Sequence, residues 1–239
     1  MSEFTENPIL VLGGGAAGLA ASAELAKLGV KSLLVEQTDR LGGLALRLAC
    51  KATETCARCG VCLVDDLLAE VAESPLIETA LGCRLEKLSR SDGGFTASIN
   101  GDQTQDRAVA GLVAAVGARP IEGSVKPQFG YDVFDDVISG LELEEMVRFK
   151  QEVARPSDGK RPQRVAFIQC VGSRDLSCGQ SSCSRICCAY TARLARWIMR
   201  HQPGTEITIF FIDLQTVGRD PEGLLAELEG RVDFVRSIP

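Results

Sequence analysis

The sequence lacks the features that mark several common classes of protein. It contains one histidine, His201, so neither a Ser-His-Asp nor a Cys-His nucleophile is well supported. The formal net charge is −6 and the basic residues are scattered, which gives no electrostatic footprint for nucleic acid or anionic lipid. No apolar run reaches the roughly 18 residues of a spanning helix, because Glu24, Lys27 and Lys31 interrupt the longest candidate.

A secretory signal is also missing, and this bears on the cysteines. The N-terminus "MSEFTENP" has no basic flank or apolar core, so we expect a cytoplasmic protein. The chain contains 10 cysteines. In a reducing compartment, they are more typical of metal binding or redox chemistry than of a disulfide framework.

The first third of the chain predicts a dinucleotide-binding βαβ unit. An apolar strand over residues 9–12 meets Gly13, Gly15 and Gly18, and a helix and a second strand over residues 32–35 follow. These glycines permit the tight turn, the approach of a pyrophosphate and the close packing of helix on strand. Glu36 ends the second strand, where a carboxylate can bind both hydroxyls of a ribose.

The residues after this acid favour FAD over NAD. The stretch "EQTDRLGGLA" resembles the acid-then-R-x-G-G pattern of the FAD-binding, glutathione-reductase-like flavoproteins, and "GLVAAVGARP" resembles their second FAD contact. We therefore predict an FAD-binding domain over residues 1–150, with short strands around a Gly93-Gly94 turn. Its predicted cofactor-binding residues are Gly13, Gly15, Ala16, Ala17, Gly18, Glu36, Gln37, Arg40, Gly42, Gly43 and Gly117.

A first cysteine cluster is inserted in this domain, with the spacing C-x5-C-x2-C-x2-C in "CKATETCARCGVC". The last three cysteines are spaced as in bacterial ferredoxin loops, which favours a [4Fe-4S] cluster held by Cys50, Cys56, Cys59 and Cys62. Cys83 is the alternative fourth ligand. Zinc and a redox dithiol are the rival interpretations.

A second βαβ unit is predicted over residues 160–239. "RVAFIQC" predicts a strand, "SRICCAYTARLARWIMRH" a helix and "EITIFFID" another strand, while the preceding acidic run "LELEEM" predicts a solvated helix face. In two-domain flavoprotein reductases, the turn after such a strand carries the glycines that bind NAD(P)H. Here Gly172 is kept, but cysteines, Arg174 and Asp175 follow it, so we predict that this unit binds no nicotinamide nucleotide.

Cysteines take the place of these glycines. Cys170 ends the strand, Cys183 and Cys187 would share a helix face, and Cys188 follows directly, so four thiolates could converge near a positive helix terminus. We favour a [4Fe-4S] cluster over zinc, because adjacent cysteines suit the separated corners of a cube. A strained vicinal disulfide between Cys187 and Cys188 is the other alternative.

The run Q-C-V-G-S-R-D followed by C-S-R-x-C-C-x-Y-T resembles the signature of the HdrA family of heterodisulfide reductases, the flavin and iron-sulfur subunits of electron-bifurcating complexes. In that family a C-x12-C-x3-C-C set binds a [4Fe-4S] cluster. The resemblance assigns Cys170, Cys183, Cys187 and Cys188 as ligands and leaves Cys178 as a bystander.

This resemblance implies an α/β oxidoreductase subunit that passes electrons between FAD and [4Fe-4S] clusters. It also implies partners: the other subunits of a heterodisulfide-reductase-like complex, ferredoxin, and a hydrogenase or dehydrogenase module. Because typical members continue beyond this point, we expect a second chain to complete the fold, or a truncation. The alternatives are a scaffold subunit with zinc at the first cysteine cluster, and a simple NAD(P)H-dependent flavin reductase.

Overall fold

The structure is a computed structural model that describes residues 6–101, 103–217 and 221–237. It divides into two compact units. The first comprises Met1–Leu46 and Gly60–Arg119, and the second comprises Arg47–Cys59 and Pro120–Pro239. In the described ranges, every helix is too short or too polar to cross a lipid bilayer.

The first unit is built on a parallel four-stranded sheet in the order β3-β2-β1-β7. Its strands are β1 (Ile9–Leu12), β2 (Ser32–Val35), β3 (Ile77–Ala80) and β7 (Gly111–Ala114). Helix α1 (Ala16–Lys27) connects β1 to β2. The predicted βαβ unit is therefore confirmed, and both of its strands have the predicted bounds.

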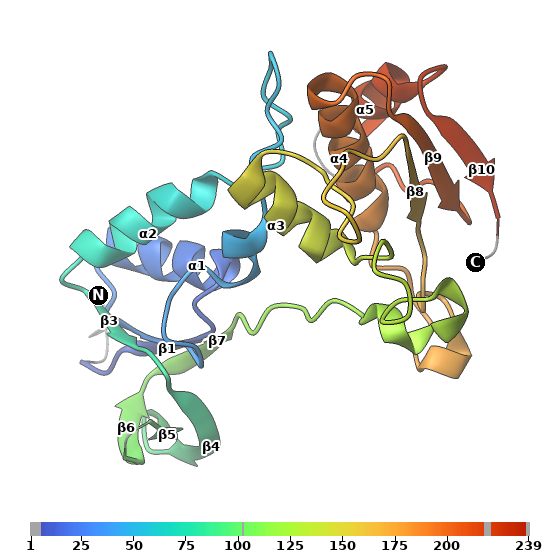
Figure 1. Ribbon diagram of the computed structural model, residues 1–239. Helices are drawn as coiled ribbons and strands as arrows, with labels where there is room; N and C mark the ends of the chain where they lie inside the picture. Colours follow the sequence, from blue (N-terminus) through green and yellow to red (C-terminus); the bar gives the residue numbers. More distant parts are fainter. Residues whose placement is uncertain (1–5, 102, 218–220, 238–239) are drawn as a thin grey trace. The chain divides into compact units, whose positions relative to one another are not determined.

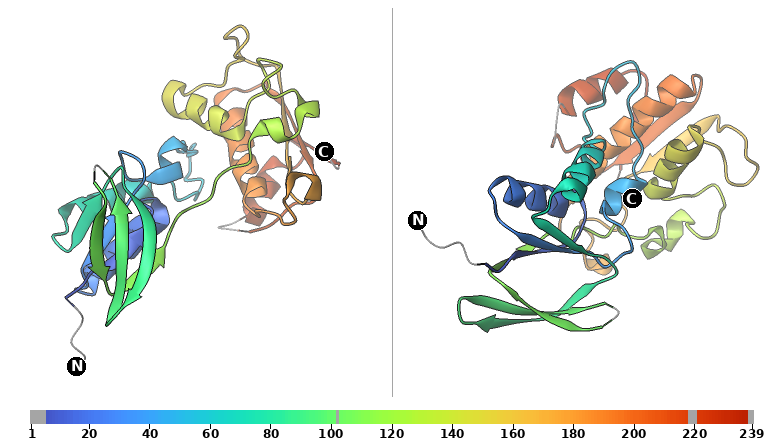
Figure 2. Two further views of the ribbon diagram at one scale, coloured as in Figure 1. Left: turned by 90° about the horizontal axis from the view of Figure 1, so that it is seen from below. Right: turned by 90° about the vertical axis from the view of Figure 1, so that its left-hand side faces the viewer.

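This sheet is covered on both faces (Figure 1). Helices α1 and α2 (Leu63–Glu73) pack on one face, where Val11 and Leu34 contact Leu19. A second, antiparallel sheet packs on the other face, where Leu10 contacts Ile99. Its strands, shown from another side in Figure 2, are β4 (Arg84–Ser91), β5 (Gly94–Asn100) and β6 (Gln105–Val109). Alternate residues of the parallel strands thus fill two separate apolar layers.

The turn between β4 and β5 lies one residue before the predicted position. Ser91 pairs with Gly94, so the two turn residues are Asp92 and Gly93. Gly93 has φ of 78°, in the left-handed region that a two-residue hairpin turn requires. Gly94 is the first residue of β5 rather than part of the turn.

The second unit contains the second predicted βαβ connection. Its parallel sheet has the order β10-β9-β8. The strands are β8 (Arg164–Ile168), β9 (Glu206–Phe211) and β10 (Asp233–Arg236), and the helices are α3 (Gly140–Lys150), α4 (Cys187–His201) and α5 (Pro221–Leu228). Short 3₁₀ helices lie at η1 (Gly43–Arg47), η2 (Gly123–Val125), η3 (Pro127–Phe129) and η4 (Leu176–Cys178).

The sheet of the second unit has one buried and one open row of apolar residues. Ile209 pairs with Phe167 and Phe234, and this row packs with the three helices in a single apolar core. The neighbouring row on the opposite face contains Ile168 and Val235, which are 41% and 39% exposed. The helices therefore bury only one face of this sheet.

The segment that carries the first cysteines belongs to the second unit, although we predicted it as an insertion in a domain ending at residue 150. The reason is a buried ion pair: the Nζ atom of Lys51 lies 2.6 Å from Oε1 of Glu144, and these side chains are 3% and 0% exposed. The backbone N–H of Ala49 also donates to Glu144. Glu144 lies in the run "LELEEM", so the prediction of a solvated helix face is wrong at this residue.

Candidate functional site

The first candidate site is the turn between β1 and α1, where two glycines leave no room for a side chain. Gly13 has φ of 101°, and an added Cβ would lie 2.3 Å from the carbonyl oxygen of Ala115. A Cβ on Gly18 would lie 1.8 Å from the carbonyl oxygen of Gly13. These two positions hold strand, turn and helix together, as the sequence predicts.

The third glycine of the turn faces open space instead. A Cβ on Gly15 would meet only the Cα of Gly43, at 3.9 Å. The first residues of α1, Ala16 and Ala17, are exposed, and the helix has no side-chain cap. Its first N–H groups therefore have no intrahelical acceptor, and the positive end of the helix dipole favours an anion there. This uncapped turn fits the pyrophosphate of a dinucleotide.

The predicted second motif lies directly against the glycine turn. Gly42 donates its backbone N–H to the carbonyl oxygen of Gly14 at 2.7 Å, and Gly42 also forms a β-bridge with Gly15. Gly43 approaches so closely that an added Cβ would lie 2.9 Å from the Cα of Gly15. The two loops thus form one backbone cradle, while the side chains of Gln37 and Arg40 are exposed beside it.

Glu36 lies at the end of β2 and is hydrogen-bonded to this cradle. Its Oε2 accepts the N–H of Gly14 at 2.7 Å, and its Oε1 accepts both the N–H and the hydroxyl of Thr38. The residue is 7% exposed. Because a carboxylate oxygen has two lone pairs, Oε2 keeps one acceptor position for a ribose hydroxyl. Gly117, with φ of 73°, follows the end of β7, and nothing lies within 4 Å of a Cβ built on it.

The second candidate site is the long turn between β8 and α4, in which several non-glycine residues have a strained backbone conformation. Cys170, Arg174 and Arg185 have φ of 64°, 55° and 66°, all in the left-handed region that non-glycine residues rarely adopt. Each such residue costs of order 1–3 kcal/mol and persists only where its surroundings hold it. We call this segment, residues 169–186, the cysteine turn.

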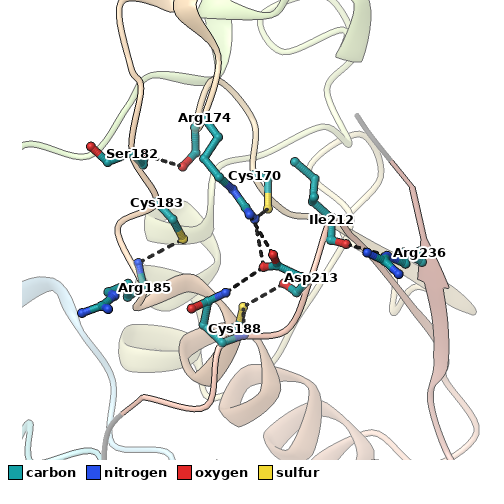
Figure 3. Close-up of polar contacts among 11 residues, drawn as sticks. Cys170, Arg174, Ser182, Cys183, Arg185, Cys188, Ile212, Asp213 and Arg236 are labelled. Atoms are coloured by element: carbon teal, nitrogen blue, oxygen red, sulfur yellow. Dashed lines mark hydrogen bonds and ion pairs between the residues drawn. The ribbon is translucent and has the colours of Figure 1, made fainter.

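Each of the four cysteines assigned as ligands has a hydrogen-bond partner at its sulfur, and for three of them this partner is a nitrogen donor, as Figure 3 shows in part. The Sγ of Cys188 accepts the backbone N–H of Gln215 at 3.3 Å, and that of Cys183 accepts the N–H of Arg185 at 3.3 Å. The Sγ of Cys187 lies 3.0 Å from the hydroxyl of Ser184, and either group can donate in that bond. The Sγ of Cys170 accepts from the Nη2 of Arg174 at 3.8 Å. Such donors stabilise thiolates.

Cys178 has different surroundings. Its thiol donates to Oδ2 of Asp175 at 3.7 Å, and the adjacent hydroxyl of Ser177 gives its proton to Oδ1 of the same carboxylate. Lys126 forms an ion pair with this carboxylate and lowers the pKa of Asp175. The sulfur of Cys178 therefore faces a carboxylate rather than a nitrogen donor.

The structure corrects one part of the predicted ligand geometry. Helix α4 begins at Cys187, so Cys183 lies before it and does not share a helix face with Cys187. The left-handed conformation of Arg185 prevents the helix from extending further toward the N-terminus. Cys187 and Cys188 are the first two helical residues, and burial raises the pKa of the Cys188 thiol.

Arg174 is a charged residue of this turn, and the sequence alone indicated no role for it at the proposed cluster. Its guanidinium forms two hydrogen bonds with Asp213, at 2.8 and 3.0 Å, and Asp213 follows directly after β9 and Ile212. The guanidinium lowers the pKa of Asp213 to about 2. Only the pairing of β8 with β9 brings these residues together, because they are 39 positions apart in the sequence.

The cysteines of the cysteine turn do not surround a single ion. In the part of the chain that the structure describes, no three His, Cys, Asp or Glu side chains converge on one metal position. All ten cysteines are free, including Cys187 and Cys188. A zinc ion needs four ligands within about 2.3 Å, whereas a cube takes one thiolate at each of four separated irons. Thiolates are donors that both zinc and a [4Fe-4S] cluster accept.

The first cysteine cluster is distributed between the units. Cys50, Cys56 and Cys59 belong to the second unit, and Cys62 and the alternative ligand Cys83 belong to the first. Among these, the Sγ of Cys56 accepts the N–H of Arg58 at 3.3 Å, and the thiol of Cys83 donates to the carbonyl of Leu81. The assignment of these four ligands stays a prediction.

A pocket of about 530 Å³ lies elsewhere in the second unit, between α3 and the segment before it. Its walls include Tyr131, Phe134, Met146 and Phe149. None of the predicted cofactor or metal residues lines it, so it is separate from both candidate sites.

Comparison with known sequences supports the predicted resemblance. Residues 11–51 match the family of NAD(P)-binding Rossmann-like domains. The chain is 41% identical over 137 residues to the HdrA iron-sulfur subunit of the CoB–CoM heterodisulfide reductase from Methanocaldococcus jannaschii, which covers 55% of this chain and 21% of the relative. It is 27% identical over 313 residues to an HdrA subunit from Methanopyrus kandleri, covering 96% of this chain and 47% of the relative. The chain thus spans about half of that relative, and the resemblance to HdrA is confirmed.

Comparison with solved structures confirms the fold class. Thioredoxin reductase from T. acidophilum aligns over 96% of this chain and 64% of its own, with a TM-score of 0.53 and 13% identity. The flavoprotein disulfide reductase RclA from Escherichia coli aligns over 99% of this chain and 50% of its own, with a TM-score of 0.55 and 16% identity.

The sequence alignment with the M. kandleri relative extends over more positions than the 239 residues of this chain, so that relative has segments that are absent here.

Proposed function

We propose that this chain, a homologue of the HdrA component of heterodisulfide reductase, is an electron-transfer subunit with FAD in the first unit and a [4Fe-4S] cluster in the second. The observation that carries the proposal is the surroundings of the sulfurs: those of Cys170, Cys183 and Cys188 accept hydrogen bonds from nitrogen, and that of Cys187 lies 3.0 Å from the Ser184 hydroxyl, while Cys178 faces a carboxylate. This distinction between five neighbouring cysteines agrees with the C-x12-C-x3-C-C ligand set.

For FAD, the chain supplies backbone rather than side chains. The uncapped N-terminus of α1 and the open position at Gly15 would receive the pyrophosphate, and the free lone pair of Glu36 would accept a ribose hydroxyl. Arg40, Gln37 and the backbone near Gly117 would complete the contacts. Bound FAD can exchange electrons in pairs or singly, and a cluster exchanges them one at a time.

We further propose that Cys50, Cys56, Cys59 and Cys62 hold a second cluster, with Cys83 as the alternative to Cys50. The partners would be other subunits of a heterodisulfide-reductase-like complex, together with ferredoxin or a hydrogenase or dehydrogenase module. The open sheet face with Ile168 and Val235 is compatible with a further polypeptide that completes the fold. The ten free thiols suit the reducing cytoplasm.

The direct test is anaerobic reconstitution of the whole chain with iron and sulfide, followed by iron analysis and electron paramagnetic resonance (EPR) spectroscopy. Cys183→Ser should lose about four irons per chain, the content of one cube, together with one EPR signal. Cys178→Ser is the matched control, since it removes a thiol from the same turn, and it should keep both. Equal iron in the two variants would refute the assignment.

The same preparation separates the alternatives. A colourless protein that contains zinc would support the scaffold interpretation, in which the flavin fold is retained without electron transfer. Rapid bleaching of bound flavin by NADH in the isolated chain would support a simple NAD(P)H-dependent reductase. The proposal expects a brown protein whose flavin is not bleached by NADH, because the cysteine turn lacks the phosphate-binding glycines.

A further inference from the structure

Arg174 is held in one orientation at the base of the cysteine turn. Its Nη1 donates to Oδ2 of Asp213 at 2.8 Å, and its Nη2 donates to Oδ1 at 3.0 Å. Asp213 itself accepts the side-chain amide of Gln215 at 2.8 Å. A two-bond fork between guanidinium and carboxylate fixes direction as well as distance, so Arg174 cannot turn freely toward solvent.

The fixed guanidinium reaches the sulfur of Cys170. Nη2 bonds both Asp213 and the Sγ of Cys170, at 3.8 Å from the sulfur, and Figure 3 shows it lying between the carboxylate and the thiol. The Nε–H of the same side chain is buried and has no acceptor among the described residues. A buried donor without a partner is costly, and a sulfur of a bound cluster is the kind of acceptor that would satisfy it.

We propose that Arg174 is a positioning residue that orients Cys170 and raises the midpoint potential of the cluster at the cysteine turn. The inference rests on the proposed function, since it concerns the cluster assigned to Cys170, Cys183, Cys187 and Cys188. Reduction adds one negative charge to a cluster, and a nearby positive charge or a hydrogen bond to sulfur stabilises that reduced state. Asp213 holds the guanidinium so that it faces the sulfur.

The chain offers a matched control in Arg185. It lies in the same turn, beside another ligand, and also has a left-handed backbone conformation. Its side chain is exposed, and only its backbone N–H contacts the sulfur of Cys183. Arg185→Gln therefore removes an equal charge from the turn but keeps the hydrogen bond to the ligand.

The experiment is an EPR-monitored redox titration of the anaerobically reconstituted chain. Arg174→Gln should shift the equilibrium between oxidised and reduced cluster about ten-fold toward the oxidised form, which corresponds to a midpoint about 59 mV lower for a one-electron couple. Arg174→Lys keeps the charge but cannot form the fork, so its midpoint should lie between those of Arg174→Gln and the wild type. Arg185→Gln should change the equilibrium less than about two-fold, because its exposed charge is screened.

Each failure has a distinct signature. If Cys183→Ser leaves the iron content and all EPR signals unchanged, the proposed function is wrong. If Cys183→Ser removes a signal but Arg174→Gln and Arg185→Gln have equal midpoints, only the role of Arg174 is refuted. If Arg174→Gln assembles no cluster, the midpoint potential of Arg174→Lys is the test. A midpoint of Arg174→Lys equal to that of the wild type overturns the inference.

Discussion

The two units use the same βαβ connection but bury different groups around it. In the first unit, apolar layers cover both faces of the sheet, and the buried polar residues in its described part are Ser22, Ser32 and Glu36. In the described part of the second unit, the buried polar residues include two basic residues and one acidic residue. They are Lys51, Glu144, Gln169, Thr191, Arg196 and Gln202. Removing one member of a buried ion pair leaves the other charge buried without a partner, so the second unit depends on both Lys51 and Glu144.

The glycine turn of the first unit and the cysteine turn of the second also differ in the groups that hold them in place. The glycine turn has three residues between β1 and α1, and its backbone leaves no room for a side chain at Gly13 but faces open space at Gly15. The cysteine turn runs from β8 to α4 with a 3₁₀ helix inside it, and polar side chains hold it in place. A short glycine turn can offer backbone N–H groups to phosphate. A long turn can instead offer side-chain thiols, with donors around them.

The largest expected effect comes from the buried ion pair of the second unit. Lys51→Met leaves the carboxylate of Glu144 buried without its counter-charge, which should lower the free energy of unfolding by about 3–5 kcal/mol. Denaturant unfolding followed by circular dichroism measures this change. Arg47→Met is the control, since Arg47 pairs with Glu145 on the surface, with side chains 49% and 38% exposed. It should cost less than about 1 kcal/mol, and equal losses would contradict the role given to the buried pair in the second unit.

Two glycines, Gly15 in the first turn and Gly18 in helix α1, should separate folding from FAD binding. Gly18→Ala places a Cβ 1.8 Å from the oxygen of Gly13, so the turn must shift, at a cost of about 1–3 kcal/mol. Gly15→Ala has room in the fold, since its nearest neighbour would lie 3.9 Å away, but it fills the predicted phosphate cradle.

We expect Gly18→Ala to be less stable than the wild type. Gly15→Ala should be stable, but the amount of FAD that it retains should be at least ten-fold lower. Thermal unfolding and flavin absorbance after gel filtration measure the two properties. Normal FAD retention in Gly15→Ala would mean that the phosphates do not lie on this turn.

The smallest effect is expected at the surface of the first unit. Arg107 of β6 donates two hydrogen bonds to Glu78 of β3, and these bonds lower the pKa of Glu78 below its usual 4.5. The stabilisation is therefore fully present above pH 4.5 and is lost as the pH falls through the lowered pKa. Because Glu78 is 56% exposed, Glu78→Gln should cost less than about 1 kcal/mol at pH 7. The difference from the wild type should vanish in acid, and a constant difference across this pH range would refute the assignment.

Local patterns predicted the elements of both units well. The strands at residues 9–12 and 32–35 have the predicted bounds, because period and glycine punctuation fix them locally. Helix α4 was predicted too long at its start, since "SRICC" contains no strong helix breaker. The left-handed Arg185 that delays the helix is a consequence of how the turn is held, which no local pattern encodes.

The sequence by itself determined the chemistry that is available. It specified two βαβ units, a turn of glycines in one and of cysteines in the other, and the spacing that singles out Cys170, Cys183, Cys187 and Cys188. These properties depend on residue type and separation along the chain, which can be read directly.

Only the tertiary structure decided what surrounds each group. The pairing of β8 with β9 brings Asp213 to Arg174, and the burial of Lys51 against Glu144 fixes the first cysteines to the second unit. Such contacts join residues 39 and 93 positions apart, respectively. Their energies depend on burial and on partners, so a charge that reads as solvated in the sequence becomes a structural requirement in the fold.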